Sequence, residues 1–166
     1  MYFYGVDPAT KKTGVAILDE DKEIIHYEVI EGEANSPEAY HTIFMRMNEL
    51  FEEYPPERVW LEDQFFKVNI DSLKKIVRVT SIVMLSTHLY DVPVELKAVG
   101  SWRKAFMGEG NGGASKRKVY DYVNEMYGDL FDSFNKYNDL TDAIGIAWGC
   151  ADTINVVPEE EVVSTK

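Results

Sequence analysis

Short apolar runs alternate with polar turns along the first part of the chain and predict β-strands. Residues 2–7 (YFYGVD) and 14–18 (GVAIL) flank a polar turn, as the two strands of a hairpin do. Residues 23–31 (EIIHYEVIE) alternate apolar and polar positions, which indicates a half-buried third strand. Residues 58–62 (RVWLE) are nearly continuous in their apolar character and predict a central fourth strand.

Apolar residues three and four positions apart predict two helices after the third strand. Ser36 precedes Pro37, a pair that favours an N-cap followed by a first helical residue. A longer helix is expected to begin at Asn69 or Asp71 and to run to about His88, because its apolar residues repeat at helical spacing.

The last part of the chain predicts one more strand and further helices. Residues 92–97 (VPVELK) indicate a fifth strand, and Pro93 favours a sheet edge or a strand start for it. A helix capped by Ser115 and ended by Gly128 is expected next. A final helix is expected to open at Asp139 and to lie close to the sheet, because it carries small residues at Ala143, Gly145, Ala147 and Gly149.

The order of these elements predicts the fold class. Three antiparallel strands followed by helix–strand crossover units are typical of an α/β domain with a mixed sheet. The chain contains no internal repeat and no linker, so residues 1–155 are expected to form a single domain. The acidic residues 156–166 are expected to form a frayed tail.

The composition predicts a folded protein without a membrane-spanning segment. The chain has 166 residues, of which 45% are hydrophobic, enough for one sizeable core. Its single cysteine, Cys150, cannot form an intrachain disulfide, and no apolar run is long enough to span a membrane. The first residues lack the basic region and the cleavage site of a signal peptide, so a cytoplasmic location is expected.

The charge is unevenly distributed along the chain. The net charge of −12, taken alone, argues against a nucleic-acid-binding protein. Residues 67–118, however, hold ten basic against four acidic residues, a net +6, whereas the remaining seven basic against twenty-five acidic residues give −18. Two interpretations stay open, namely a basic face on an acidic body and ordinary lysines on solvated helix surfaces.

Four acidic residues stand where such a fold can bring them together. Asp7 closes the first strand and Glu62 the fourth, and ligand sites of α/β sheets lie at such strand ends. Asp139 and Asp142 are one helical turn apart. Four carboxylates in one cleft would repel each other and take up protons, a cost that divalent cations remove. Each acid also has a purely structural interpretation, as a turn residue, a strand end or a partner of the helix dipole.

Four stretches resemble the RuvC-type Holliday-junction resolvases of bacteria and phages, within the RNase H-like fold of the retroviral-integrase superfamily. These stretches are YGVDPATKKTGVAIL, VWLEDQFFKVNIDSLK, GNGGASKRKVYDYV and NDLTDAIGIAWG, and they occur in the family's order between Tyr4 and Gly149. The resemblance implies an α/β domain whose five-stranded mixed sheet has the order 3-2-1-4-5 and is flanked by helices.

The resemblance also assigns roles to individual residues. Two Mg²⁺ ions per active site, replaceable by Mn²⁺, would be held by the family's catalytic acids, which fall on Asp7, Glu62, Asp139 and Asp142. Lys116 falls near the scissile phosphate as a further catalytic residue, whereas Arg103 stands where a lysine is usual. DNA contacts are expected from two aromatic and several basic residues: Phe65, Phe66, Lys67, Lys74, Arg103, Lys104, Lys116, Arg117 and Lys118. The two phenylalanines could instead form a hydrophobic cluster at the sheet end.

The implied activity is that of a crossover junction endodeoxyribonuclease acting in DNA recombination and repair. It would cut four-way DNA junctions by paired symmetric nicks through two-metal-ion hydrolysis. The resemblance implies a homodimer through the helix after Glu62, whose residues Ile76, Ser81, Val83 and Met84 could form the dimer face or pack on the sheet. Two alternatives stay open: a broader phage nuclease that debranches Y-junctions and flaps, and a non-catalytic module that binds branched DNA.

Overall fold

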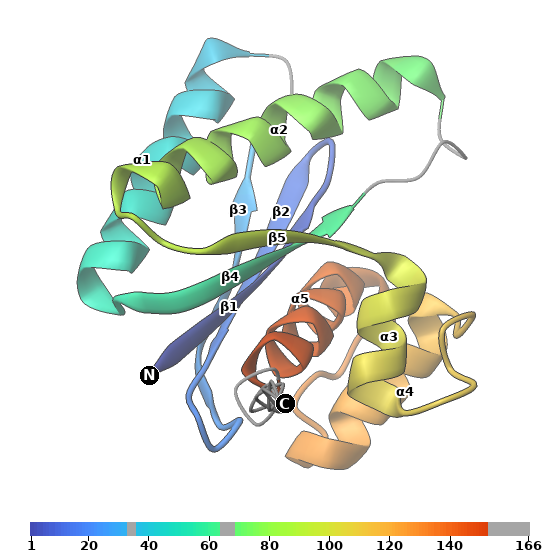
Figure 1. Cartoon of the computed structure of the whole chain (residues 1–166). Helices are drawn as coiled ribbons and strands as arrows, with labels where there is room; N and C mark the ends of the chain where they lie inside the picture. The colour runs from blue at the N-terminus through green and yellow to red at the C-terminus, as the bar shows by residue number, and fades with distance from the viewer. Residues whose placement is uncertain (33–35, 64–68, 153–166) are drawn as a thin grey trace, which may run out of the picture.

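One mixed sheet forms the centre of the computed structural model, which describes residues 1–32, 36–63 and 69–152 (Figure 1). Its strands lie in the order β3-β2-β1-β4-β5, which confirms the predicted order and the edge position of the fifth strand. β1 pairs with β2 in antiparallel and with β4 in parallel orientation. The strands are β1 (Tyr2–Pro8), β2 (Lys12–Leu18), β3 (Ile24–Glu31), β4 (Pro56–Asp63) and β5 (Val94–Ala98).

Helices cover both faces of this sheet. The helices are α1 (Pro37–Glu53), α2 (Ile70–Leu89), α3 (Val99–Met107), α4 (Lys116–Tyr127) and α5 (Phe134–Asp152). α1 and α2 lie on one face, and α5 lies on the other with α3 and α4 beside it (Figure 1). The predicted caps are confirmed: the Ser36 side chain accepts a hydrogen bond from the Ala39 N–H at 3.0 Å, and Gly128 ends α4 in the left-handed conformation.

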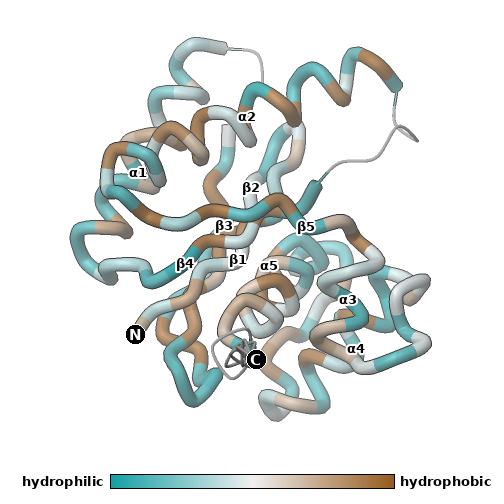
Figure 2. Tube along the Cα trace, viewed as in Figure 1, coloured by the Kyte–Doolittle hydropathy of each residue, from teal (hydrophilic) through white to brown (hydrophobic). Residues whose placement is uncertain are grey.

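The hydrophobic core has two layers, one on each face of the sheet. Alternate residues of each strand point to opposite faces, so Tyr4 and Val6 pack toward α1 and α2, whereas Phe3 packs toward α5. Apolar and polar positions succeed one another along α2, and apolar positions gather along α5 (Figure 2). No helix within the described ranges is long and apolar enough to cross a membrane.

α5 approaches the sheet closely because small residues face each other. A Cβ atom on Gly5 of β1 would lie 2.1 Å from the Ala143 carbonyl oxygen and 2.3 Å from the Ala147 nitrogen. The predicted close approach is therefore present at these residues. Gly145, in contrast, faces α3, where an added Cβ would meet the Phe106 and Trp102 rings at 2.9 Å.

The last helix begins earlier than its sequence predicts. α5 starts at Phe134, so the expectation that it opens at Asp139 is wrong. The Ser133 carbonyl oxygen accepts a hydrogen bond from the Tyr137 N–H at 3.1 Å, which begins the helix more than a turn before Asp139. Both aspartates consequently lie inside the helix, and dipole pairing at the helix start does not explain them.

α2 presents two different apolar faces. Ile76 and Val83 are 6% and 0% exposed on the inner side of the helix, so the alternative that they pack within the subunit is the one observed. The outer side carries apolar residues that are 39–68% exposed: Ile70, Val77, Met84, Leu85 and Leu89. The positions of Phe65, Phe66, Lys67 and the 156–166 tail lie outside the described residues.

Candidate active site

Two of the predicted acids emerge side by side from neighbouring parallel strands. Val6 of β1 pairs with Leu61 of β4, so Asp7 and Glu62 follow at the same end of the sheet. Both side chains are largely buried, with Asp7 3% and Glu62 6% exposed. Neither residue is therefore an ordinary surface turn or strand end, because a buried carboxylate is costly unless a partner compensates it.

The other two acids come from α5, which crosses the same end of the sheet. Asp142 is fully buried, and the Asp139 side chain, one turn earlier, is 24% exposed. Gly14, which pairs with Asp7, makes room for this approach, because a Cβ there would lie 2.4 Å from the Asp139 carbonyl oxygen. We call Asp7, Glu62, Asp139 and Asp142 the carboxylate cluster.

One ammonium group lies among these carboxylates. Lys116 begins α4, whose N-cap Ser115 accepts a hydrogen bond from the Lys118 N–H at 3.2 Å. Its Nζ lies 2.9 Å from Asp142 Oδ2, 3.3 Å from Asp139 Oδ1 and 3.4 Å from Asp7 Oδ2. The Lys116 side chain remains 43% exposed, so the cluster opens to solvent on this side.

Burial and mutual repulsion change the acidity of the cluster. Burial, together with the charge of Glu62, raises the pKa of Asp7 well above its ordinary value, although Lys116 opposes this shift. Burial likewise raises the pKa of Glu62 and of Asp142, against the lowering effect of Lys116. Burial lowers the pKa of Lys116, but the charges of Asp7 and Asp142 outweigh it and raise the pKa overall. The cluster thus has more negative charge than one ammonium group neutralises.

Two residues of α3 hold the surroundings of the cluster in place. The Trp102 indole N–H donates a hydrogen bond to Glu62 Oε2 at 2.9 Å, and the Trp102 side chain is fully buried. Arg103 donates a hydrogen bond to the Ala114 carbonyl oxygen and lies 3.9 Å from Asp142 Oδ2. Only 11% of the Arg103 side chain is exposed, so it faces the cluster and the loop before α4 more than the solvent.

The donors of the cluster fit a hard divalent cation. All four side chains offer carboxylate oxygens, which Mg²⁺ and Mn²⁺ prefer. The Oδ1 atom of buried Asp142 accepts no hydrogen bond from any described residue, so it has a free lone pair. Within the described ranges no three acidic, histidine or cysteine side chains are arranged as a finished metal site, and the Lys116 ammonium lies where three of the carboxylates meet.

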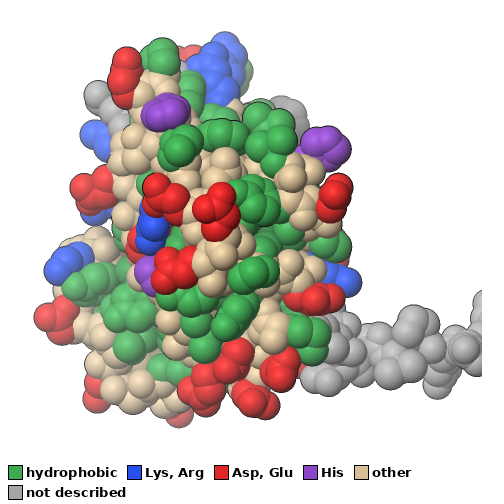
Figure 3. All heavy atoms as spheres, turned by 90° about the vertical axis from the view of Figure 1, so that its left-hand side faces the viewer, with side chains coloured by type: hydrophobic (Ala, Val, Ile, Leu, Met, Phe, Trp, Pro, Cys, Tyr) green, Lys and Arg blue, Asp and Glu red, His purple; other side chains and the backbone are tan. Residues whose placement is uncertain are grey.

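The remaining predicted basic residues lie on α2, α3 and α4. Lys118 is exposed and donates to Asn111 at 2.7 Å, and Lys104 forms an ion pair with Glu109 at 2.6 Å. Arg117 forms an ion pair with Asp121 at 2.9 Å, and Lys74 is exposed on α2. On the side where β1 begins, away from the cluster, acidic and apolar side chains predominate and basic ones are scattered (Figure 3).

Comparison with known proteins gives a consistent result for the sequence and for the fold. The family model described as crossover junction endodeoxyribonuclease RuvC matches residues 3–149. The RuvC of Cytophaga hutchinsonii is 30% identical over 148 residues, covering 86% of this chain and 72% of that protein. The RuvC of Xylella fastidiosa is 27% identical over 149 residues, covering 86% and 83%. The fold is similar to that of Thermus thermophilus RuvC, solved with a Holliday junction, at a TM-score of 0.76 and 24% identity, covering 93% and 95%.

Proposed function

The chain belongs to the RuvC family of crossover junction endodeoxyribonucleases, and from this premise we propose that it resolves four-way DNA junctions. The reaction is hydrolysis of one phosphodiester bond in each of two symmetric strands. The observation that carries the proposal is the carboxylate cluster, because three of its four acids meet around one Lys116 ammonium at the end of the sheet. We also propose that it acts in the cytoplasm of a bacterial or phage-infected cell.

We propose that the cluster holds two Mg²⁺ ions and that Mn²⁺ can replace them. Its oxygen donors and its excess of negative charge support this assignment. Bound there, two divalent ions would lower the pKa of an attacking water and stabilise the departing 3′ oxygen.

The residues of this chain have distinct tasks in that reaction. Asp7 ends β1 beside Glu62 of β4, its Oδ2 lies 3.4 Å from the Lys116 Nζ, and it would be one of the metal-holding carboxylates. Trp102 orients Glu62 through its hydrogen bond, and Arg103 holds the loop before α4 close to Asp142. Lys116, being half exposed and cationic, neutralises the charge that develops on the phosphate.

The DNA-binding surface is proposed to include the exposed basic residues around the cluster. Lys104, Arg117 and Lys118 are exposed on α3 and α4, the helices that contact the cluster, and Lys74 is exposed on α2. Phe65, Phe66 and Lys67 follow β4 in the sequence and retain their predicted role in contacting bases and backbone. Because phosphate contacts release counterions, binding is expected to weaken steeply with salt.

The enzyme is proposed to act as a homodimer through the outer side of α2. Five apolar side chains lie exposed there, an apolar stripe along one helix that a second copy can cover. Ser81 lies on the same side and is small enough to permit close approach of two helices. A twofold dimer places two active sites symmetrically, as a four-way junction requires.

The test is cleavage of labelled branched substrates. The protein is incubated with an immobile four-way junction, a Y-junction and a linear duplex, each with Mg²⁺ and with EDTA. Symmetric Mg²⁺-dependent cuts in the four-way junction are expected, with the other two substrates cut much more slowly. Equal cutting of the Y-junction would identify a general debranching nuclease instead. Binding without cutting in either Mg²⁺ or Mn²⁺ would identify a branched-DNA binding module.

A further inference from the structure

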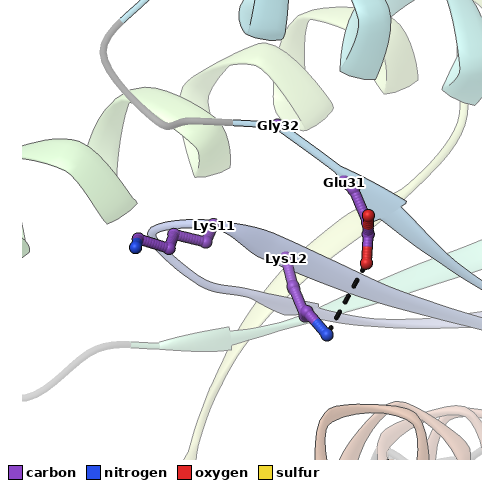
Figure 4. Close-up of a pocket in the computed structure, with 4 residues that line it drawn as sticks. All are labelled: Lys11, Lys12, Glu31 and Gly32. Atoms are coloured by element: carbon purple, nitrogen blue, oxygen red, sulfur yellow. Dashed lines mark ion pairs between the residues drawn. The ribbon is translucent and has the colours of Figure 1, made fainter. Parts of the chain in front are cut away.

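A second group of lysines lies beside the carboxylate cluster, on β2 and α5 rather than on α4. Lys12 and Lys136 line one cavity of about 230 Å³ with Tyr27, Tyr137 and Leu140. Lys12 also lines an adjoining pocket of about 310 Å³ with Lys11, Glu31 and Gly32 (Figure 4). The two hollows share Lys12 and Glu31, so they form one continuous surface.

The chain connects these lysines directly to the cluster. Lys12 lies two residues before Gly14, which pairs with Asp7 across the hairpin. Gly14 in turn contacts the α5 backbone at Asp139. Lys136 lies three residues before Asp139 on the same helix, which is nearly one turn. Both residues therefore lie within a few positions of the acids that would hold the metal ions at the reacting phosphate.

The charge of this surface is positive despite the acidic chain. Glu28 lines the cavity, but Arg46 donates hydrogen bonds to both of its carboxylate oxygens at 2.7 and 3.1 Å and offsets part of its charge, while also pairing with Glu49 at 2.9 Å. The Lys12 Nζ lies 3.6 Å from Glu31 Oε1, and the Glu31 side chain is 73% exposed. Solvent screens such an exposed ion pair, so it holds the lysine only weakly.

The other two lysines are held less directly than Lys12: the Lys136 Nζ lies 4.7 Å from the Tyr137 ring centroid, and Tyr137 and Asp132 raise the pKa of Lys136. Neither Lys11 nor Lys136 forms a salt bridge with any described residue, and Figure 4 shows the Lys11 side chain extending away from Glu31. Among the described side chains that line the two hollows, three are lysines and two are glutamates, and Arg46 pairs with one of these glutamates. Such a surface fits a polyanion better than a neutral or cationic ligand.

We propose that Lys11, Lys12 and Lys136 form a phosphate track that holds the backbone of the strand being cut, next to the scissile phosphate. This inference rests on the proposed function and adds a binding surface to it. The track ends at Tyr27 and Tyr137, because the next cavity beyond these rings is lined by Asp129 and Asp132. The phosphates held there belong to the cut strand on one side of the cluster, and those held by α4 lie at the cluster itself.

The test is the salt dependence of junction binding. Binding of a fluorescent four-way junction is measured by anisotropy in Ca²⁺ between about 50 and 200 mM salt. The protein is compared with the variant that carries Lys12→Ala and Lys136→Ala. Each lost phosphate contact removes about 0.9 from the slope of log K against log salt, so the double variant is expected to lose about 1.8 and to bind roughly 10-fold more weakly or worse.

Two further variants control for charge and for folding. Lys22→Ala removes one positive charge, half the change in the double variant, from the opposite end of the sheet, where Lys22 pairs with Asp152, and it is expected to leave the slope unchanged. Lys12→Arg with Lys136→Arg is expected to retain the wild-type slope, and thermal unfolding confirms that each variant is folded.

The outcomes separate this inference from the proposed function. A slope in the folded double variant equal to that of the wild type would overturn the phosphate track and leave the resolvase proposal intact. An equal loss of slope in the Lys22→Ala variant would also overturn it, because net charge alone would then account for the change. Failure of the wild type to bind the junction at all would overturn the proposed function, and the inference with it.

Discussion

Replacing Lys116 by methionine removes the one ammonium group among the acids while keeping most of the apolar stem. Without metal, three carboxylates then lose a cation that lies 2.9 to 3.4 Å away. Breaking a fully buried ion pair costs about 3–5 kcal/mol. Because the Lys116 side chain is 43% exposed, solvent screens part of this interaction, and a loss of about 2 kcal/mol in the free energy of unfolding is expected in EDTA. In a domain of this size that corresponds to roughly 4–8 °C in Tm.

Divalent cations are expected to reverse the effect. In the wild type a metal ion must displace the Lys116 ammonium from Asp142 and Asp7, whereas the Lys116→Met variant offers the same carboxylates without a competitor. The apparent Kd for Mn²⁺ is expected to fall by about tenfold, worth about 1.4 kcal/mol of extra stabilisation at saturating metal.

Calorimetric titration with Mn²⁺ and thermal unfolding with and without EDTA measure both quantities without DNA. Lys118→Met is the matched control for stability, since Lys118 lies on the same helix and contacts Asn111 instead of the carboxylate cluster. Equal stability of the wild type and the Lys116→Met variant in EDTA, with equal Mn²⁺ affinity, would refute the reasoning.

Three further predictions address the packing of α5, the charge of the cluster and the dimer. Gly5→Ala is expected to lower the free energy of unfolding by about 3 kcal/mol or more, because the added Cβ would lie 2.1 Å from the Ala143 carbonyl oxygen. Urea unfolding measures this loss, and Gly113→Ala, whose Cβ would meet no atom within 4 Å, is the control. The pKa values of the cluster are raised, so above about pH 4 the unfolded state releases protons that the metal-free folded state keeps. The free energy of unfolding of the metal-free protein is therefore expected to fall as the pH rises above about 4. Mg²⁺ must displace those protons, so the Tm gain from Mg²⁺ is expected to grow as the pH rises above about 4, and a gain independent of pH would contradict this. Val77→Glu with Leu85→Glu is expected to give a folded monomer by light scattering, whereas a dimer that persists would exclude the outer side of α2 as the interface.

The strands themselves and the strand ends that carry the two sheet acids followed from the sequence because hydrophobic periodicity is a local property, whereas the order of the strands came from the resemblance to the RuvC-type resolvases. Asp7 and Glu62 end apolar runs, and the ends of paired parallel strands necessarily meet. The start of α5 was not predicted, because Asn135, Lys136 and Asn138 resemble a polar loop and obscure the helical spacing of Phe134, Tyr137 and Leu140.

Contacts between distant segments could not be read from the pattern. Nothing local to Trp102 indicates that its indole donates to Glu62, forty residues earlier, and nothing local to Arg103 indicates that it turns inward toward Asp142. The sequence also could not show which side of α2 faces the core, since apolar residues occur on both sides. Only the structure shows that Ile76 is buried and Val77 exposed. The sequence did not indicate a DNA contact by Lys12 and Lys136, because both lie outside the basic stretch and only the fold of the hairpin and α5 brings them to one cavity.

The most direct test of the central claim is cleavage of a supercoiled plasmid that extrudes a four-way junction. Two symmetric cuts within one binding event linearise the plasmid, whereas a single cut leaves a nicked circle. With Mg²⁺ the wild type and Asp21→Asn, which alters an exposed acid far from the site, are expected to give mainly linear product. Asp142→Asn is expected to bind the junction but to cut at least about 1,000-fold more slowly. Linear product formed by Asp142→Asn at the wild-type rate would contradict the assignment of the carboxylate cluster as the active site.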